Sequence, residues 1–376
     1  MEFNYFLPVN LIFGRGRTEQ LGALAAGFGR RALVVTGSGS TKRSGLLSRV
    51  QEYLERAGVE AVIYDEVPQN PLTTTAEKGV DMARKNACDV VIGVGGGSVM
   101  DCAKAVAFLA VNPGDVTDYI FSRRTGSGCM PLILIPTTCG TGSEGNGFAV
   151  LTNPETGDKK SLRSDWIVPR ASIVDSELME TMPKHILSSV GFDALCHAME
   201  AYLSKRAQPM TDAVCEYAMR LIGKNLIPLY NGENSPGTWD AITLASTLGG
   251  MVIHTAGTVL PHGMEHPASG LKNIVHGRGL AALVPAITEA SVDAACARYS
   301  TISQCIGGQS EKDCAAALRR FLNAIRLTVT LGELGITEED IPWLTDNCLK
   351  ISGASIANHP KEFDAAGIAE LYRRAL

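Results

Sequence analysis

Short apolar runs alternate with segments of helical spacing along the first half of the chain. The runs are rich in valine, isoleucine and leucine, as is typical of strands buried on both faces. The intervening segments repeat apolar residues at helical intervals, for example Leu46, Val50 and Leu54. The predicted strands are 32–36, 61–64, 90–94, 132–135 and 171–174, and the predicted helices are 41–57, 73–85 and 99–110. This alternation predicts a mostly parallel sheet with right-handed crossovers. Residues 1–13 are expected to add an edge hairpin.

The pattern changes near Met182-Pro183, after which strand-like runs almost disappear. Helical spacing predicts helices over 185–205, 210–225, 239–255 and 311–327. We therefore expect an α/β, Rossmann-like domain over residues 1–180, followed by an all-helical domain over residues 181–376.

Composition agrees with two soluble domains, because 376 residues with 45% hydrophobic and 19% charged positions suit a globular chain of that size. A formal charge of −5 disfavours binding to nucleic acid or an anionic membrane. No run of 18 apolar residues predicts a membrane helix, and the N-terminal sequence lacks the basic region of a secretory signal. The 10 scattered cysteines, without a CxxC pair, indicate reduced thiols in a cytoplasmic protein.

A glycine-rich turn joins the predicted strand at 90–94 to the helix that follows. It contains Gly95, Gly96, Gly97 and Ser98, and Asp101 lies in the first helical turn. Glycines allow a ligand to approach the backbone, and a helix N-terminus offers N–H groups to an anion such as a pyrophosphate. The full GxGxxG fingerprint is absent, so a tight structural turn remains the alternative.

A second polar turn follows the strand at 132–135. Thr137, Thr138 and Ser143 bring hydroxyl groups there, interleaved with glycines. Two such turns after strands of one sheet fit a dinucleotide laid across the strand ends. An ordinary polar loop is the alternative.

Candidate metal ligands occur in two short segments of the helical half. Asp193 and His197 stand at positions i and i+4, which places both on one helix face. His262, His266 and His276 follow within LPHGMEHPASGLKNIVHG. One carboxylate and several imidazoles suit Fe²⁺ or Zn²⁺ better than Mg²⁺ or Ca²⁺. Each residue taken alone could instead be an ordinary core or surface side chain.

Together these motifs resemble the iron-containing (group III) alcohol dehydrogenase family. The resemblance rests on GGGSVMD (95–101), TTCGTGSE (137–144), GFDALCHAMEAY (191–202) and HGMEHP with VHG (262–277). It implies an active site in a cleft between the two domains, with metal ligands at Asp193, His197, His262 and His276. It places His266 near the nicotinamide and substrate. It also implies cofactor contacts at Gly95, Gly96, Gly97, Ser98, Asp101, Thr137, Thr138, Ser143, Asn70 and Lys159, where a slip of one residue would exchange Lys159 for Lys160.

Two positions depart from the family pattern. NAD-preferring relatives often carry an aspartate where this chain has Gly37, and such an acid repels a 2′-phosphate. Ser38 and Ser40 bring hydroxyl groups and two cations follow them, so we expect a preference for NADP(H) over NAD(H). A turn without cofactor selectivity is the alternative. Cys139 replaces a small apolar residue, and we expect its thiol near the nicotinamide, where oxidation could affect it.

The expected function is a metal-dependent alcohol dehydrogenase or aldehyde reductase acting on a small alcohol or aldehyde. The resemblance implies Fe²⁺, with Zn²⁺ as a substitute, and a homodimer or larger homo-oligomer. His266, four residues after His262, is the candidate proton acceptor. One alternative is a lyase of the dehydroquinate synthase type, which needs more cations than Lys272, the one cation of the two metal segments. The other is a family member that has lost its activity.

Overall fold

The computed structural model describes residues 2–376, which divide into two compact units. The α/β unit consists of residues 7–156 and 160–181. The helical unit consists of residues 182–376 together with the short segments 2–6 and 157–159. The division near residue 181 lies beside the predicted boundary at 180, but the two short segments were not expected to join the helices.

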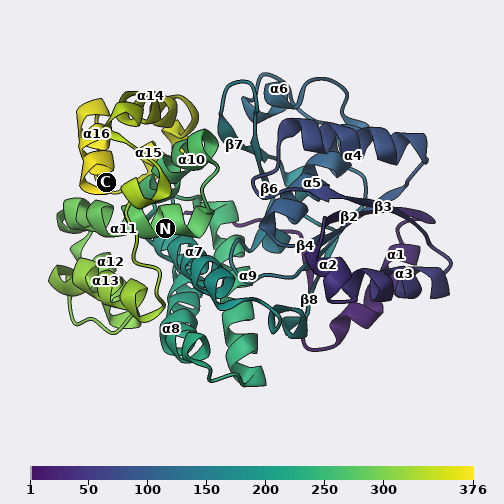
Figure 1. Ribbon diagram of the computed structural model, residues 1–376, viewed down its shortest axis with the longest axis horizontal. Coiled ribbons are helices and arrows are strands. Elements are labelled where there is room, and N and C mark those ends of the chain that lie inside the picture. The colour runs from purple at the N-terminus through teal and green to yellow at the C-terminus, as the bar shows by residue number, and fades with distance from the viewer. Residues whose placement is uncertain (1) are drawn as a thin grey trace. The chain divides into compact units, whose positions relative to one another are not determined.

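The α/β unit is built on a parallel sheet of six strands in the order β1-β8-β5-β4-β2-β3 (Figure 1). Its strands are β1 (Asn10–Phe13), β2 (Arg31–Gly37), β3 (Glu60–Val67), β4 (Val90–Gly95), β5 (Leu132–Pro136) and β8 (Ala171–Val174). The predicted parallel sheet is confirmed. The predicted edge hairpin is wrong, because β1 does not fold back on a neighbour: it pairs in parallel with β8, with Asn10 opposite Ala171. An edge strand recruited from a distant segment cannot be foreseen from local pattern.

Helices cover both faces of this sheet (Figure 1). Val34, Ile92 and Ile133 pack with α1 (Leu21–Ala26) and α3 (Leu46–Arg56). Their sequence neighbours Leu33, Val91 and Leu134 face the opposite side. There they pack with α4 (Thr73–Lys85), α5 (Gly97–Val111) and α6 (Val116–Ile120). Consecutive residues of one strand are therefore all buried, which explains the continuous apolar runs in the sequence.

Two local features differ from the expected pattern. The helix expected over 41–57 is broken into α2 (Ser40–Arg43) and α3, because Gly45 between them has a left-handed φ of 71°. The structure also contains an unpredicted two-stranded sheet, β6 (Phe148–Thr152) with β7 (Lys159–Arg163). The sequence of β7, KKSLR, is short and cationic, so it carries no strand signal.

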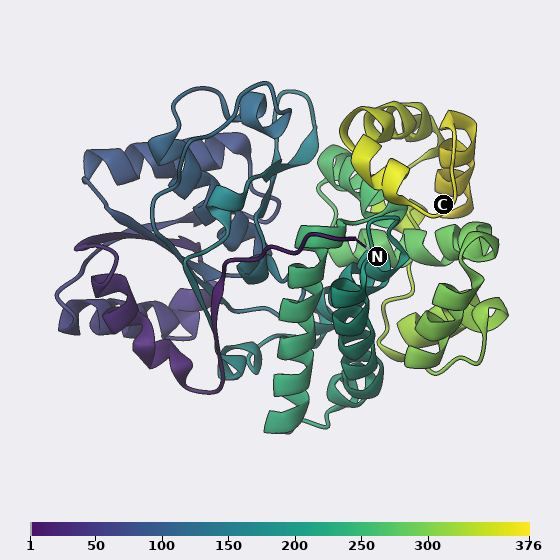
Figure 2. The ribbon, with the colours of Figure 1, turned by 180° about the vertical axis from the view of Figure 1, so that it is seen from behind.

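The second unit is entirely helical after residue 182, as predicted. Its helices are α7 (Lys184–Leu203), α8 (Pro209–Asn231), α9 (Pro236–Ala256), α10 (Leu260–Lys272), α11 (His276–Ser291), α12 (Cys296–Cys305), α13 (Cys314–Ala324), α14 (Ile341–Ile351), α15 (Gly353–Asn358) and α16 (Ala365–Arg374). Helices α7, α8 and α9 pack on one another and form the teal and green group of long helices in Figure 2. Within residues 2–376, no helix taken singly is long and apolar enough to cross a membrane; only the pair α9 and α10, bent by 103°, passes that test together.

Helix α7 lies at the centre of the helical unit, and its residues from Gly191 to Leu203 are all buried. A helix buried on every side needs neighbours that approach closely. Gly249 of α9 provides such an approach, because a Cβ added there would lie 3.2 Å from the Ala194 carbonyl oxygen. The polar side chains that α7 carries inward must therefore find partners inside the protein.

Candidate metal centre

Three polar residues of α7 share one buried face. Asp193, His197 and Glu200 follow at intervals of four and three residues, and their exposed fractions are 3%, 5% and 2%. Facing residues come from α10, which carries His262 and Glu265 fully inside the unit.

The predicted ligands converge on a single carboxylate oxygen. Asp193 Oδ1 lies 3.7 Å from His197 Nδ1, 3.4 Å from His262 Nε2 and 3.6 Å from His276 Nε2. The ring centroids of His197 and His262 are 4.5 Å apart, and those of His262 and His276 are 5.1 Å apart. Four residues that span more than 80 positions in sequence thus surround one point.

Two atoms at this point lack hydrogen bonds. In the part of the chain that the structure describes, Asp193 Oδ1 and His262 Nε2 are buried and have no hydrogen-bond partner. An unsatisfied buried polar atom costs about 1–3 kcal/mol, so such atoms call for a further partner. A carboxylate with three imidazoles is a donor set suited to Fe²⁺ or Zn²⁺, and the residues present fit such an ion.

Buried charges control the protonation of these groups. Burial alone would raise the pKa of the Asp193 carboxyl, but the imidazoles of His197 and His276 hold it well below its usual range. Burial would lower the pKa of His262, but the carboxylates of Glu200 and Asp193 raise it to about 10. In the absence of an ion, a proton on His262 therefore helps to balance the buried carboxylates, so a proton and a metal compete for this imidazole.

Sequence reasoning missed two carboxylates of this centre, Glu200 and Glu265. Glu200 accepts a 2.6 Å hydrogen bond from His262 Nδ1, and Glu265 accepts one from His276 Nδ1. Burial would raise the pKa of Glu265, but His276 and Lys159 lower it below its ordinary value. The signal was helical spacing: Glu200 is seven residues after Asp193, and Glu265 is three after His262.

His266 lies at the edge of the centre and is half-buried. Its ring centroid is 6.1 Å from that of His262 and 5.7 Å from that of His276. Glu265, His266 and His276 are also close enough to form a second group of possible ligands. The hydrogen bond to Glu265 occupies Nδ1 of His276, so His276 can offer only Nε2 to an ion. Because Nε2 lies toward Asp193, this favours the group of ligands that contains Asp193.

Helix α10, which carries His262, is held in place by helices of the same unit. Pro267 lies inside α10 and has no N–H, so the carbonyl of Gly263 loses its helical partner. The thiol of Cys348 on α14 donates to that carbonyl over 3.3 Å. Tyr372 on α16 donates to the Met264 carbonyl over 2.7 Å. These contacts fix the position of α10 on the rest of the unit.

The predicted cofactor turns follow neighbouring strands of the α/β unit. Gly37 is the last residue of β2, and Asn70 follows β3. The glycine turn at 95–98 begins with the last residue of β4, and the turn at 137–143 follows β5. Because these strands are parallel, all four segments lie at the carboxyl edge of the sheet, where open α/β sheets bind ligands. The structure thus groups the predicted cofactor residues of this unit.

Some of these residues also have structural partners. A Cβ on Gly96 would lie 3.0 Å from Thr138 Oγ1, so the two turns pack tightly on each other. Asp101 accepts hydrogen bonds from Ser143 Oγ at 2.6 Å and from the Val150 N–H at 2.9 Å. These contacts hold the second turn on α5, and a direct contact of Asp101 or Ser143 with the cofactor stays a prediction.

Lys104 completes this arrangement as a fully buried cation. Its ammonium donates to Ser143 Oγ at 2.8 Å, to Asn146 Oδ1 at 2.9 Å and to the Phe148 carbonyl at 2.7 Å. Burial lowers its pKa to about 8, although Asp101 and Glu144 raise it in part. Nothing in the sequence distinguishes this lysine from a solvated one.

Replacing Lys104 with methionine is expected to destabilise the protein by about 3–5 kcal/mol, because it removes a buried ammonium that donates three hydrogen bonds and that balances the charges of Asp101 and Glu144. Urea-induced unfolding followed by circular dichroism measures the change. The exposed Lys78 on α4 provides a matched control, since Lys78→Met should stay within about 0.5 kcal/mol of the original chain. A loss below about 1 kcal/mol for Lys104→Met would contradict this account.

The two candidate lysines at the start of β7 differ in surroundings. Lys159 is buried, with its Nζ 3.9 Å from Glu265 Oε2, whereas the ammonium of Lys160 lies 5.6 Å from the centre of the Phe121 ring. Cys139 is buried, and burial raises the pKa of its thiol to about 12. The thiol therefore stays protonated, which disfavours the oxidative sensitivity expected from its position.

Comparison with known proteins agrees with this geometry. Residues 8–176 match the family described as iron-containing alcohol dehydrogenase, and residues 188–376 match the C-terminal part of that family. A 1,3-propanediol dehydrogenase from Klebsiella pneumoniae is 33% identical, over 99% of this chain and 98% of the relative. An NAD-dependent methanol dehydrogenase from Bacillus methanolicus is 31% identical, over 99% and 100%. An NADPH-dependent butanol dehydrogenase from Clostridium saccharobutylicum is also 31% identical, over 98% and 96%.

The fold is shared with solved structures as well. An archaeal halo-thermophilic alcohol dehydrogenase from a Red Sea brine pool superposes with a TM-score of 0.96 at 30% identity, over 100% of this chain and 99% of that one. The family matches lie in both units, over residues 8–176 and 188–376. The chain therefore belongs to the iron-containing alcohol dehydrogenase family.

Proposed function

We propose that this protein is a metal-dependent alcohol dehydrogenase that transfers a hydride between NADP(H) and a small alcohol or aldehyde. The observation that carries the proposal is the convergence of three imidazoles on the Asp193 carboxylate. Family membership supports it, since relatives are named for oxidising propanediol, methanol and butanol. Fe²⁺ is the proposed native ion and Zn²⁺ the alternative.

Each part of the centre has a proposed task. Asp193, His197, His262 and His276 would hold the ion. A bound divalent ion would supply Lewis acidity, which lowers the pKa of an alcohol hydroxyl and polarises an aldehyde carbonyl. The burial of Asp193 and His262 keeps bulk water away from the reacting atoms, which strengthens electrostatic effects there. His266 is half-buried, and this position supports a role in passing the hydroxyl proton to solvent.

A direct assay tests the reaction. Protein loaded with Fe²⁺ or Zn²⁺ is mixed with primary alcohols, diols and aldehydes and with either cofactor, and the absorbance of the reduced nicotinamide is followed. We expect turnover with at least one small alcohol or aldehyde. Absence of turnover across the panel, in protein that binds both metal and nicotinamide, would overturn the proposed reaction.

The preference for NADP(H) is proposed from the turn after β2. Gly37 offers no carboxylate to repel a 2′-phosphate. A Cβ on Gly39 would contact the guanidinium of Arg43, so this cation lies over the turn. Lys42 forms an ion pair with Asp65, which reduces its contribution. One relative with 31% identity is named NAD-dependent and another with the same identity NADPH-dependent, so the argument depends on this turn alone.

Replacing Gly37 with aspartate is expected to shift the ratio of kcat/KM for NADPH over NADH downward by about tenfold or more, equivalent to about 1.4 kcal/mol. The new carboxylate would repel a 2′-phosphate and accept hydrogen bonds from a ribose 2′-hydroxyl. Steady-state kinetics with both cofactors measures the ratio. Gln51→Glu, which adds an exposed negative charge on α3, should leave the ratio unchanged. A wild-type protein that already prefers NADH would refute the proposed preference.

The proposed location of the protein is the cytoplasm. All ten cysteines are free thiols, which suits the reducing cytoplasm. We also propose that the protein forms a homodimer or larger homo-oligomer and that its partner molecule is a small alcohol or aldehyde.

A further inference from the structure

Two histidines of the metal centre share one hydrogen-bonding pattern. His262 and His276 each turn Nε2 toward Asp193, at 3.4 Å and 3.6 Å. Each ring directs Nδ1 to a buried glutamate, Glu200 for His262 and Glu265 for His276. A proton held on Nδ1 by a carboxylate leaves the lone pair of Nε2 directed at the ion position.

Glu200 is itself held rigidly. Its Oε1 accepts from His262 Nδ1, and its Oε2 accepts from the Val259 N–H at 2.9 Å and the His262 N–H at 3.4 Å. These N–H groups belong to the N-cap residue and the first turn of α10, where a helix has unsatisfied donors and favours negative charge. One α7 carboxylate thus fixes both the start of α10 and the ring of His262.

Glu265 joins the next two helices in a similar way. Its Oε2 accepts from His276 Nδ1, its Oε1 accepts from Ser269, and the Lys159 ammonium lies 3.9 Å from Oε2. The side chain of Glu265 is completely buried. His276 is the first residue of α11, so Glu265 on α10 determines how that helix begins beside the centre.

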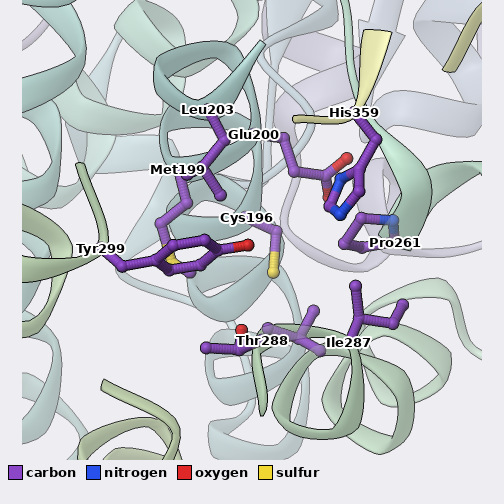
Figure 3. Close-up of a pocket in the computed structure, with 10 residues that line it drawn as sticks. Cys196, Met199, Glu200, Leu203, Pro261, Ile287, Thr288, Tyr299 and His359 are labelled. Atoms are coloured by element: carbon purple, nitrogen blue, oxygen red, sulfur yellow. The ribbon is translucent and has the colours of Figure 1, made fainter. Parts of the chain in front are cut away.

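Glu200 also lines a small cavity of the helical unit (Figure 3). Its walls include Cys196, Thr288, Tyr299 and His359, and they contain no lysine or arginine. Burial lowers the pKa of His359 to about 3, so this imidazole is neutral. Its Nε2 is hydrogen-bonded to Ser291 Oγ at 2.8 Å. The cavity walls therefore offer Glu200 no cation. The hydrogen-bond partner of its Oε1 atom is the imidazole of His262.

We propose that Glu200 and Glu265 are positioning residues that orient His262 and His276 for metal binding through hydrogen bonds to Nδ1. The proposal rests on the proposed function only for the presence of the ion. It predicts that each glutamate contributes to metal affinity without touching the metal. Loss of such an outer partner commonly weakens metal binding by about 10–100-fold.

The test uses Glu200→Gln and Glu265→Gln, which keep the side-chain volume and remove the negative charge. The dissociation constant for Zn²⁺ is measured by competition with a chromophoric chelator, and Co²⁺-substituted protein gives a visible absorption spectrum that reports ligand geometry. We expect about 10–100-fold weaker Zn²⁺ binding and a changed Co²⁺ spectrum in each variant. Asp212→Asn is the matched control, because the carboxylate of Asp212 on α8 is also hydrogen-bonded, but to Arg298, at 2.9 Å.

Outcomes separate the alternatives without any activity measurement. A folded variant with unchanged Zn²⁺ affinity and an unchanged Co²⁺ spectrum would overturn the role of that glutamate. Failure of both variants to fold, under conditions where the metal-free original protein folds, would assign them a structural role and also overturn it. A protein that binds metal normally but turns over no alcohol would refute the proposed reaction and leave this test intact.

Discussion

Replacing Asp193 with alanine is expected to remove the metal and the activity together. Asp193 Oδ1 lies within 3.7 Å of nitrogen atoms from three histidines, and it brings negative charge to the ion position. Without this carboxylate, three neutral imidazoles would have to hold a doubly charged cation with no negative ligand. Lewis-acid assistance contributes several kcal/mol and each 1.36 kcal/mol is tenfold, so kcat/KM should fall by about a thousandfold or more.

Metal content is measured by elemental analysis after dialysis, in parallel with steady-state kinetics. Asp346→Ala changes an exposed carboxylate on α14 of the same unit and should retain both metal and activity. Retention of one equivalent of metal by Asp193→Ala would show that this carboxylate is not a ligand.

Replacing His266 with alanine is expected to lower kcat by about 10²–10⁴-fold while metal content stays close to that of the original protein. This is the usual contribution of a positioned proton acceptor. His266 belongs to the same helix as His262 but lies at the half-buried edge of the cluster. Steady-state kinetics measures kcat, and elemental analysis of the same preparations measures the metal content.

His185→Ala is the control, since His185 is exposed near the start of α7. Loss of metal in the His266 variant would contradict the proposed role. It would instead assign His266 to the second group of possible ligands, with Glu265 and His276.

The sequence predicts the sheet well because its strands are buried on both faces. Residues such as Val91 and Ile92 face opposite cores, so β4 appears in the sequence as an unbroken apolar run. An amphipathic helix would show polar residues at regular intervals instead. The edge of the sheet was less predictable. β1 is defined by pairing with β8, more than 150 residues away, and such pairing leaves no local pattern.

The candidate ligands could be proposed from spacing and residue type, whereas their supporting groups could not. Glu200 and Glu265 look like ordinary surface acids until burial is known, because glutamate is rarely fully buried without a partner. Lys104 was hidden for the same reason: the segment that buries it, with Ser143 and Asn146, lies about 40 residues further along the chain. The roles of these three residues depend on tertiary packing, which the local sequence around each of them does not predict.

Pro267 has a consequence for how this chain can vary in length. Since the proline leaves the Gly263 carbonyl available and Cys348 donates to it, α10 can meet α14 in one register only. An insertion or deletion of one residue between His262 and Gly263 would rotate His262 by about 100° around the helix axis, because the contact of Gly263 with Cys348 would hold the remainder of α10 in place. Length changes in this stretch should therefore be excluded from functional variants, whereas the exposed connection at 232–235 should accept them.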